Sequence, residues 1–192
     1  IREMGCKVTP AIADCLFTGI STDTGCFRYP NVTPETMRIA ADLMEAGAQA
    51  AYINRLMFET RSRARVRAER LILDTLTESF GGRCAEIVVS KAMMAETGVR
   101  EDELDGISAL PRRIEGVWVS VTYHERENGY KISMRTGDEV DACTVCAALG
   151  GGGHKRAAGC FISGSLGEAR ERIRCALESF LPVPPNHGEG TV

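Results

Sequence analysis

Two short alternating segments on either side of an Asn-Gly pair constrain the fold of this chain more than any other feature. Residues 116–125 read GVWVSVTYHE, and residues 129–136 read GYKISMRT. Alternation of apolar and polar residues is typical of strands with one buried face. Asn128 and Gly129, where the second segment begins, form a dipeptide that is a strong hairpin signal. The sequence therefore predicts an antiparallel hairpin here.

The same alternation assigns the side chains of the second strand to two faces. Ile132 and Met134 share the apolar face, whereas Ser133 and Arg135 share the other. An arginine fork beside a hydroxyl on a rigid strand suits a phosphate or a carboxylate. An exposed edge-strand arginine without a ligand fits the pattern equally well, and periodicity alone leaves both readings open.

Four consecutive glycines, Gly150–Gly153, precede His154 and Lys155. Backbone without side chains lets N–H groups approach an anion closely, and the two basic residues add donors. A flexible loop with solvated basic residues is the alternative. A helix pattern at residues 139–148 and a strand at GCFISG favour an ordered phosphate-binding turn, but the pattern does not show whether Arg135 lies near it.

The first eighty residues show helical patterns, near residues 9–20, after Thr33 and over residues 61–80. Thr33 suits an N-cap, Pro34 suits the first helical position, and Gly81-Gly82 ends the last pattern. The apolar stripe expected on this last helix is Val66, Leu73, Leu76 and Phe80. We expect a helical first piece and a small α+β second piece, divided near residue 82.

Composition restricts the class of protein. The net charge of −3 makes any anion-binding site a local feature, and no apolar run approaches the length of a membrane span. Several of the eight cysteines lie in helix-like runs, which favours free thiols in a reducing cytoplasm. Cys143 and Cys146 form a C-x-x-C pair, but a zinc site needs further ligands, so two small residues on a helix are the favoured interpretation.

Asp23 is flanked by threonines and a glycine in the stretch STDTG. A carboxylate in a polar loop can bind a hard metal ion. A lone aspartate there more often forms a turn or a helix cap, and the residues alone favour that second interpretation.

Taken together, two stretches resemble the DHH/DHHA1 phosphoesterase family. Residues 19–48, around STDTG, resemble the end of its DHH domain, and residues 115–160, ending in GGGGHKRAAGC, resemble its DHHA1 domain. The resemblance runs from about residue 9 to residue 178 and is strongest to the nanoRNase branch. It implies a manganese-dependent phosphoesterase of short oligoribonucleotides or of 3′-phosphoadenosine 5′-phosphate.

The resemblance also implies roles for individual residues. Asp23 matches a ligand to one of two Mn²⁺ ions, and Ser133 and Arg135 match a strand that holds substrate phosphates. A further signature, which closes over a phosphate, consists of Gly151, Gly152, Gly153 and His154. His154 is its catalytic residue, and the adjacent Lys155 is a helper.

The chain departs from the family at its amino-terminal side. No Asp-His-His triplet occurs, and no histidine precedes His124. We therefore expect a fragment of α/β class, inactive alone and not retaining manganese. Its expected parts are the end of a DHH domain (1–60), a connecting helix (61–82), a mixed-sheet DHHA1 domain (83–182) and a disordered tail (183–192).

Two other functions stay open at this stage. One is a nucleotide or nucleic-acid phosphate-binding module without catalysis, and the other is a cyclic-dinucleotide phosphodiesterase. The expected partners are short RNA or phosphonucleotides and no membrane, and a homodimer is left open.

Overall fold

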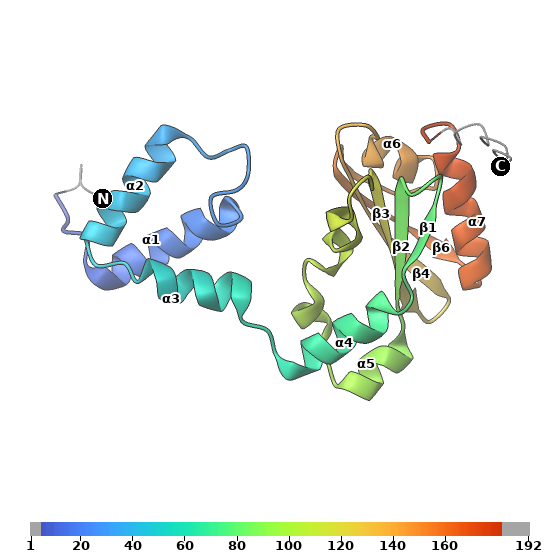
Figure 1. The fold of residues 1–192 in the computed structure, drawn as a ribbon, viewed down its shortest axis with the longest axis horizontal. Coiled ribbons are helices and arrows are strands. Elements are labelled where there is room, and N and C mark those ends of the chain that lie inside the picture. The colour runs from blue at the N-terminus through green and yellow to red at the C-terminus, as the bar shows by residue number, and fades with distance from the viewer. Residues whose placement is uncertain (1–4, 182–192) are drawn as a thin grey trace, which may run out of the picture. The chain divides into compact units, whose positions relative to one another are not determined.

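The computed structural model describes residues 5–181, which form two compact units divided between Arg61 and Ser62 (Figure 1). The first unit is helical, and the second holds one mixed sheet with helices. This confirms the α/β class. The predicted disordered tail, 183–192, lies outside the described residues.

The first unit consists of three α-helices and a π-helical turn. These are α1 (Pro10–Asp23), α2 (Pro34–Glu45), α3 (Ala50–Asn54) and η2 (Arg55–Glu59). Thr33 caps α2, with its hydroxyl accepting from the Thr36 amide and Pro34 at the first position, as predicted. A small core of Ala13, Phe17, Ala40, Leu43 and Ile53 joins the helices.

The structure differs from the single helix expected over residues 61–80. The helix α4 (Arg63–Leu73) ends early, and β1 (Thr77–Ser79) follows. Its buried side chains are Arg65, Ala68 and Ile72, while Val66 is 56% exposed. Arg65 is buried because its guanidinium donates to the carbonyl oxygens of Glu103 and, at 2.8 Å, Asp105. The helix ends just before Thr75, whose hydroxyl donates to the Ile72 carbonyl oxygen at 2.6 Å and accepts from the Val88 amide at 2.9 Å.

Six strands form the sheet of the second unit, in the order β1-β2-β3-β4-β6-β5. Their bounds are β2 (Cys84–Val89), β3 (Val119–Arg126), β4 (Gly129–Thr136), β5 (Gly152–His154) and β6 (Ala157–Ser163). Only β2 and β3 are parallel. The β3–β4 pair, with Arg126 opposite Gly129, is the predicted hairpin.

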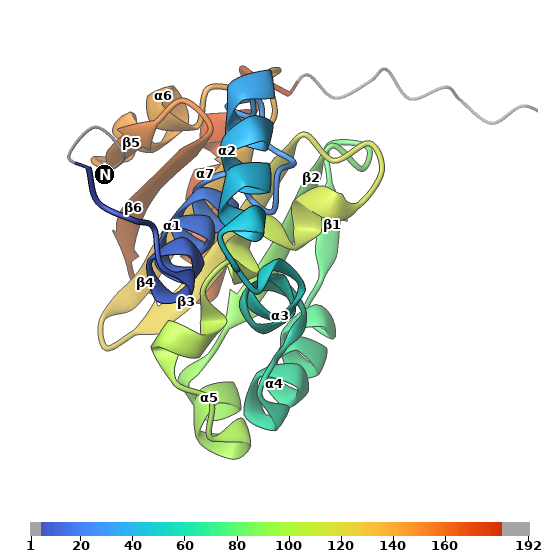
Figure 2. The same cartoon turned by 90° about the vertical axis from the view of Figure 1, so that its left-hand side faces the viewer.

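The parallel pair needs a crossover, and the chain between β2 and β3 supplies it. It contains α5 (Lys91–Thr97) and three short 3₁₀ helices, η3 (Glu101–Leu104), η4 (Ile107–Ala109) and η5 (Pro111–Arg113). The helices α4 and α5 lie side by side at the end of this unit away from α6 (Ala142–Ala147) (Figure 2). They enclose a core with Ile87 and Val89 of β2.

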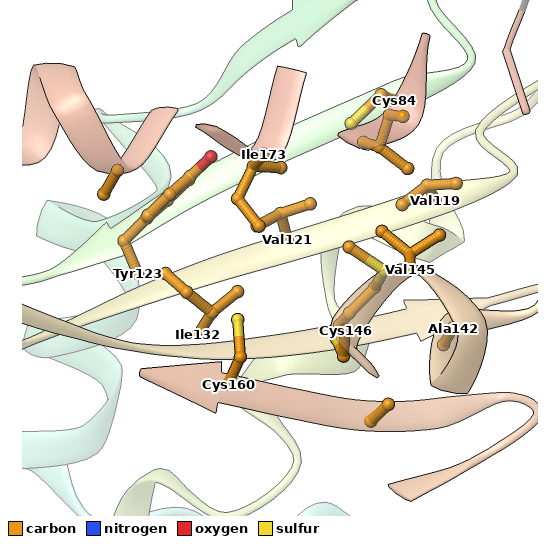
Figure 3. Packing of buried hydrophobic residues seen from close by; sticks show 14 of the residues in the cluster. Cys84, Val119, Val121, Tyr123, Ile132, Ala142, Val145, Cys146, Cys160 and Ile173 are labelled. Carbon is orange, nitrogen blue, oxygen red and sulfur yellow. The ribbon is translucent and has the colours of Figure 1, made fainter. Parts of the chain in front are cut away.

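The main core lies on the other face of the sheet. Alternate residues of β3 and β4 are fully buried there, among them Val121, Tyr123 and Ile132. They pack against Val145 and Cys146 of α6 and against Ile173 of α7 (Leu166–Leu177) (Figure 3). A capping box of Ser165 and Glu168 begins α7. Because this face is filled, the other face of β4, β5 and β6 is left for a ligand.

The start of β4, where it lies against β6, should depend strongly on Gly129. Its φ is 154°, and a Cβ there would lie 2.2 Å from the Ile162 carbonyl oxygen. Gly116, with φ 82°, has open space around that position. We expect Gly129→Ala to lower the free energy of unfolding by more than about 1 kcal/mol, and by more than Gly116→Ala, in urea titrations. Equal losses would show that the close approach at Gly129 is not limiting.

Candidate functional site

The register of the sheet brings the predicted phosphate-binding residues onto one face. Arg135 of β4 lies opposite Ala157 of β6, which in turn lies opposite His154 of β5. Residues directly opposite one another on antiparallel strands point to the same face. Two strand spacings of about 4.8 Å separate Arg135 from His154, and only the methyl group of Ala157 lies between them.

A second row runs beside the first. Ser133 lies opposite Gly159, and Gly159 lies opposite Gly152. Two of these three positions carry no side chain, so the sheet surface next to Ser133 is bare backbone. The structure therefore answers the question that the sequence left open, because it places Arg135 and Ser133 on the same face as the glycine-histidine motif.

The glycine motif is partly a strand rather than a loop. The amides of Gly150 and Gly151 donate to Ala147 and Cys146 carbonyl oxygens, at 3.0 and 2.8 Å, where they end α6. These two amides are therefore not free donors for an anion, in contrast to the turn of open N–H groups expected from the sequence.

The individual glycines have different reasons to lack a side chain. A Cβ on Gly151 would lie 2.2 Å from the Gly159 carbonyl oxygen, and one on Gly153 would lie 2.6 Å from that of Ala157. Both therefore allow the close approach of β5 to β6. A Cβ on Gly152 would meet nothing within 4 Å. Gly152 is thus open to a ligand, and substrate contacts by Gly151 and Gly153 stay a prediction.

The side chains of His154 and Lys155 are exposed, while the backbone around them is held in place. The Lys155 carbonyl oxygen accepts from the Ala142 amide at 2.8 Å and from the Thr136 hydroxyl at 3.3 Å. Arg156 forms an ion pair with Asp138. The two predicted basic residues are therefore available to an anion on a rigid edge.

A cleft of about 520 Å³ lies on the same face. Its floor is formed by His124, Lys131, Ser133 and Arg135, and its wall by residues of the segment 101–109. Sequence reasoning missed His124 and Lys131. The signal was present, because Lys131 is two residues before Ser133 on one strand and pairs with His124 across the hairpin.

Burial and neighbouring positive charges in this cleft keep His124 neutral at pH 7. Burial, followed by the neighbouring cations Arg126 and Lys131, lowers the pKa of His124 from 6.5 to about 4. Its Nε2 lies 3.5 Å from the Ser108 hydroxyl. The opposite rim is acidic, although Glu101 is ion-paired with Arg126.

Asp23 belongs to the first unit, and the other predicted site residues belong to the second. It is the last residue of α1 rather than part of a loop, and its carboxylate accepts from Asn31 Nδ2 at 3.1 Å. Across residues 5–181 there is no group of three or more His, Cys, Asp or Glu side chains that could hold a metal ion. The residues present therefore do not form a manganese site by themselves.

Comparison with known proteins identifies the class to which this sheet belongs. The DHHA1 domain model matches residues 84–181, and the chain belongs to this family. This confirms the resemblance to DHH/DHHA1 proteins inferred from the two motifs.

Individual relatives show which members of the family this chain is similar to. The chain is 39% identical over 183 residues to the bifunctional oligoribonuclease and PAP phosphatase NrnA of Thermus thermophilus, and 26% identical over 180 residues to NrnA of Bacillus subtilis. It is similar in structure to an exopolyphosphatase-related protein from Bacteroides fragilis, with a TM-score of 0.83 and 27% identity, covering 91% of this chain and 52% of that one.

These matches cover nearly all of this chain but about half of each relative. They take in 94% and 93% of the chain, yet only 54% and 56% of the two NrnA proteins. The same region is 26% identical to an A-adding tRNA nucleotidyltransferase of Aquifex aeolicus, where it spans 21% of that protein. Within the described part of the chain, no helix combines the length and apolar character needed to cross a membrane.

The depressed pKa of His124 makes stability depend on pH. The folded state favours neutral His124, so its contribution is complete above the ordinary pKa of 6.5 and is lost as the pH falls from there toward 4. We expect urea unfolding to show a larger loss of stability between about pH 7.5 and about pH 4.5 for the parent chain than for His124→Asn. Parallel losses in the two proteins would contradict this assignment.

Proposed function

We propose that this chain is the substrate-binding part of a phosphoesterase that degrades short oligoribonucleotides and 3′-phosphoadenosine 5′-phosphate. The observation that carries the proposal is the row of Arg135, Ala157 and His154, which presents two nitrogen-rich side chains across a nearly bare surface. The oligoribonuclease and PAP phosphatase functions for which the NrnA relatives are named support this substrate class.

Each residue of this face has a chemical role in the proposal. Arg135 offers a planar fork that matches two phosphate oxygens, and Ser133 donates a hydroxyl beside it. His154 contacts the reacting phosphate as the catalytic residue, and Lys155 adds positive charge at the rigid edge. Gly152 lets the nucleotide approach the backbone.

Two Mn²⁺ ions are the proposed cofactor of the whole protein, where they would supply an activated water and stabilise charge on phosphorus. Asp23 is the one ligand proposed in this chain. Because a hard cation needs about six oxygen or nitrogen ligands, the described residues bind and orient the substrate without completing the reaction. A reducing cytoplasm is the proposed location, which suits the buried free thiols of Cys84, Cys146 and Cys160.

A second candidate is a phosphate-binding module for nucleic acid that serves other chemistry. The match to the tRNA nucleotidyltransferase favours it, since nearly the whole of this chain corresponds to a fifth of that larger protein. Both candidates use the same face of the sheet, and they differ in what the rest of the protein does. Hydrolysis of oligoribonucleotides by a full-length protein separates them.

Nucleotide binding tests the site itself. We expect Arg135→Ala to weaken binding of 3′-phosphoadenosine 5′-phosphate by roughly 10- to 150-fold, the loss of a charged hydrogen bond worth about 1.5–3 kcal/mol, measured by calorimetry. Gly152→Ala should weaken binding without lowering the unfolding temperature, because its methyl group points into open space.

The matched control is Arg172→Ala, which removes the same charge from an exposed position on α7, the helix over the opposite face. It should bind as the parent chain does. Loss of affinity in Arg172→Ala equal to that in Arg135→Ala would mean that net charge, and not this face, determines binding.

The chain alone should bind without hydrolysing. With Mn²⁺ present, we expect no release of phosphate from 3′-phosphoadenosine 5′-phosphate and no mononucleotides from pApA in a chromatographic assay, because residues 5–181 hold no metal cluster. A protein extended to the length of the NrnA relatives is the positive control. Mn²⁺-dependent turnover by the 192-residue chain would contradict the proposal that this chain binds the substrate but does not complete the reaction.

A further inference from the structure

Phe161 is an aromatic side chain on the ligand face that no core uses. It is 51% exposed, whereas its neighbours Cys160 and Ile162 are buried on the other face. Phe161 lies opposite Lys131 of β4, so the two side chains share the face of Ser133 and Arg135.

A second hollow of about 480 Å³ lies beside Phe161. Gly152, Gly159 and Phe161 line it, and Lys131 contributes positive charge, while Arg126 at its edge is ion-paired with Glu101. No acidic residue lines this hollow, in contrast to the larger cleft, whose lining includes Glu101, Asp102 and Asp105. A flat bare surface, an aromatic ring and cations together suit a ligand that is planar in part and anionic in part.

The hollow is continuous with the phosphate row along the strands. Rows two residues apart along β4 are separated by about 7 Å at a strand rise of 3.4 Å per residue. The Lys131–Phe161 row is therefore about 14 Å from the Arg135–His154 row, with Ser133 and the two glycines between them. This separation leaves room for a nucleoside between two anchored groups.

We propose that Phe161, with Lys131 beside it, forms a stacking subsite for a base of a short single-stranded oligonucleotide whose phosphate is held by Arg135 and His154. The inference rests on the proposed function and adds a length preference to it. A ligand with two or more nucleotides can place a base at the Lys131–Phe161 row and a phosphate at the Arg135–His154 row. 3′-Phosphoadenosine 5′-phosphate, which has one base, occupies the two rows less completely. Stacking on an aromatic ring accepts every base, so this subsite distinguishes length and not sequence.

Calorimetry of the 192-residue chain with pApApA tests this subsite. We expect Phe161→Ala to weaken binding by about 5- to 150-fold, the range for one stacked base, and to leave binding of an abasic trinucleotide of the same charge unchanged. Phe161→Leu should also lose affinity because it lacks a ring face, and Phe161→Trp should retain it. Tyr52→Ala removes an aromatic that is 50% exposed in the first unit and serves as the matched control.

The outcomes separate this inference from the proposed function. If Phe161→Ala or Phe161→Leu binds pApApA as the parent chain does while Arg135→Ala does not, the stacking subsite is overturned and the phosphate site stands. If the parent chain binds neither pApApA nor 3′-phosphoadenosine 5′-phosphate, both are overturned. Unfolding temperatures of the Phe161 variants should match the parent, since the ring lies outside the core clusters.

Discussion

The close pairing of β6 with strands on both sides is the constraint on which the ligand face depends. A Cβ on Gly159 would lie 2.6 Å from the Ile132 carbonyl oxygen, and one on Gly153 would lie 2.6 Å from that of Ala157. Glycine at these positions lets three strands lie together without intervening side chains. Arg135 and His154 can therefore reach one ligand from the two outer strands, with only Ala157 between them.

The opposite face of the same strands provides the rigidity that such a site needs. Ile132 and Met134 alternate with Ser133 and Arg135 and are fully buried under α6 and α7. A strand whose alternate side chains are locked in a core holds the remaining ones in fixed directions. The ends of the glycine motif are held in the same way, by the amides that end α6 and by the bonds to the Lys155 carbonyl oxygen.

The parts of this structure that the sequence predicted are those set by local patterns. Alternation identified the hairpin and both faces of β4, and cap residues identified the start of α2. Strand β5 could not be predicted, because its glycines carry no strand preference and its pairing with β6 depends on close backbone approach. The end of α4 could not be predicted either, since the Thr75 hydroxyl that follows it accepts a hydrogen bond from the Val88 amide of the neighbouring strand β2. His124 and Lys131, by contrast, follow from the same alternation that identified Arg135.

The arrangement of charge explains how an acidic chain can offer a site for a polyanion. The net charge is −3, yet on this side of the sheet Lys131 and Arg135 lie on β4, Lys155 lies in the turn between β5 and β6, and Glu101 is neutralised by Arg126. Attraction at short range depends on the nearest charges, because those beyond about 10 Å are largely screened in solution. His124 adds no positive charge to this face at pH 7, because burial lowers its pKa to about 4, so the attraction depends on the lysines and on Arg135.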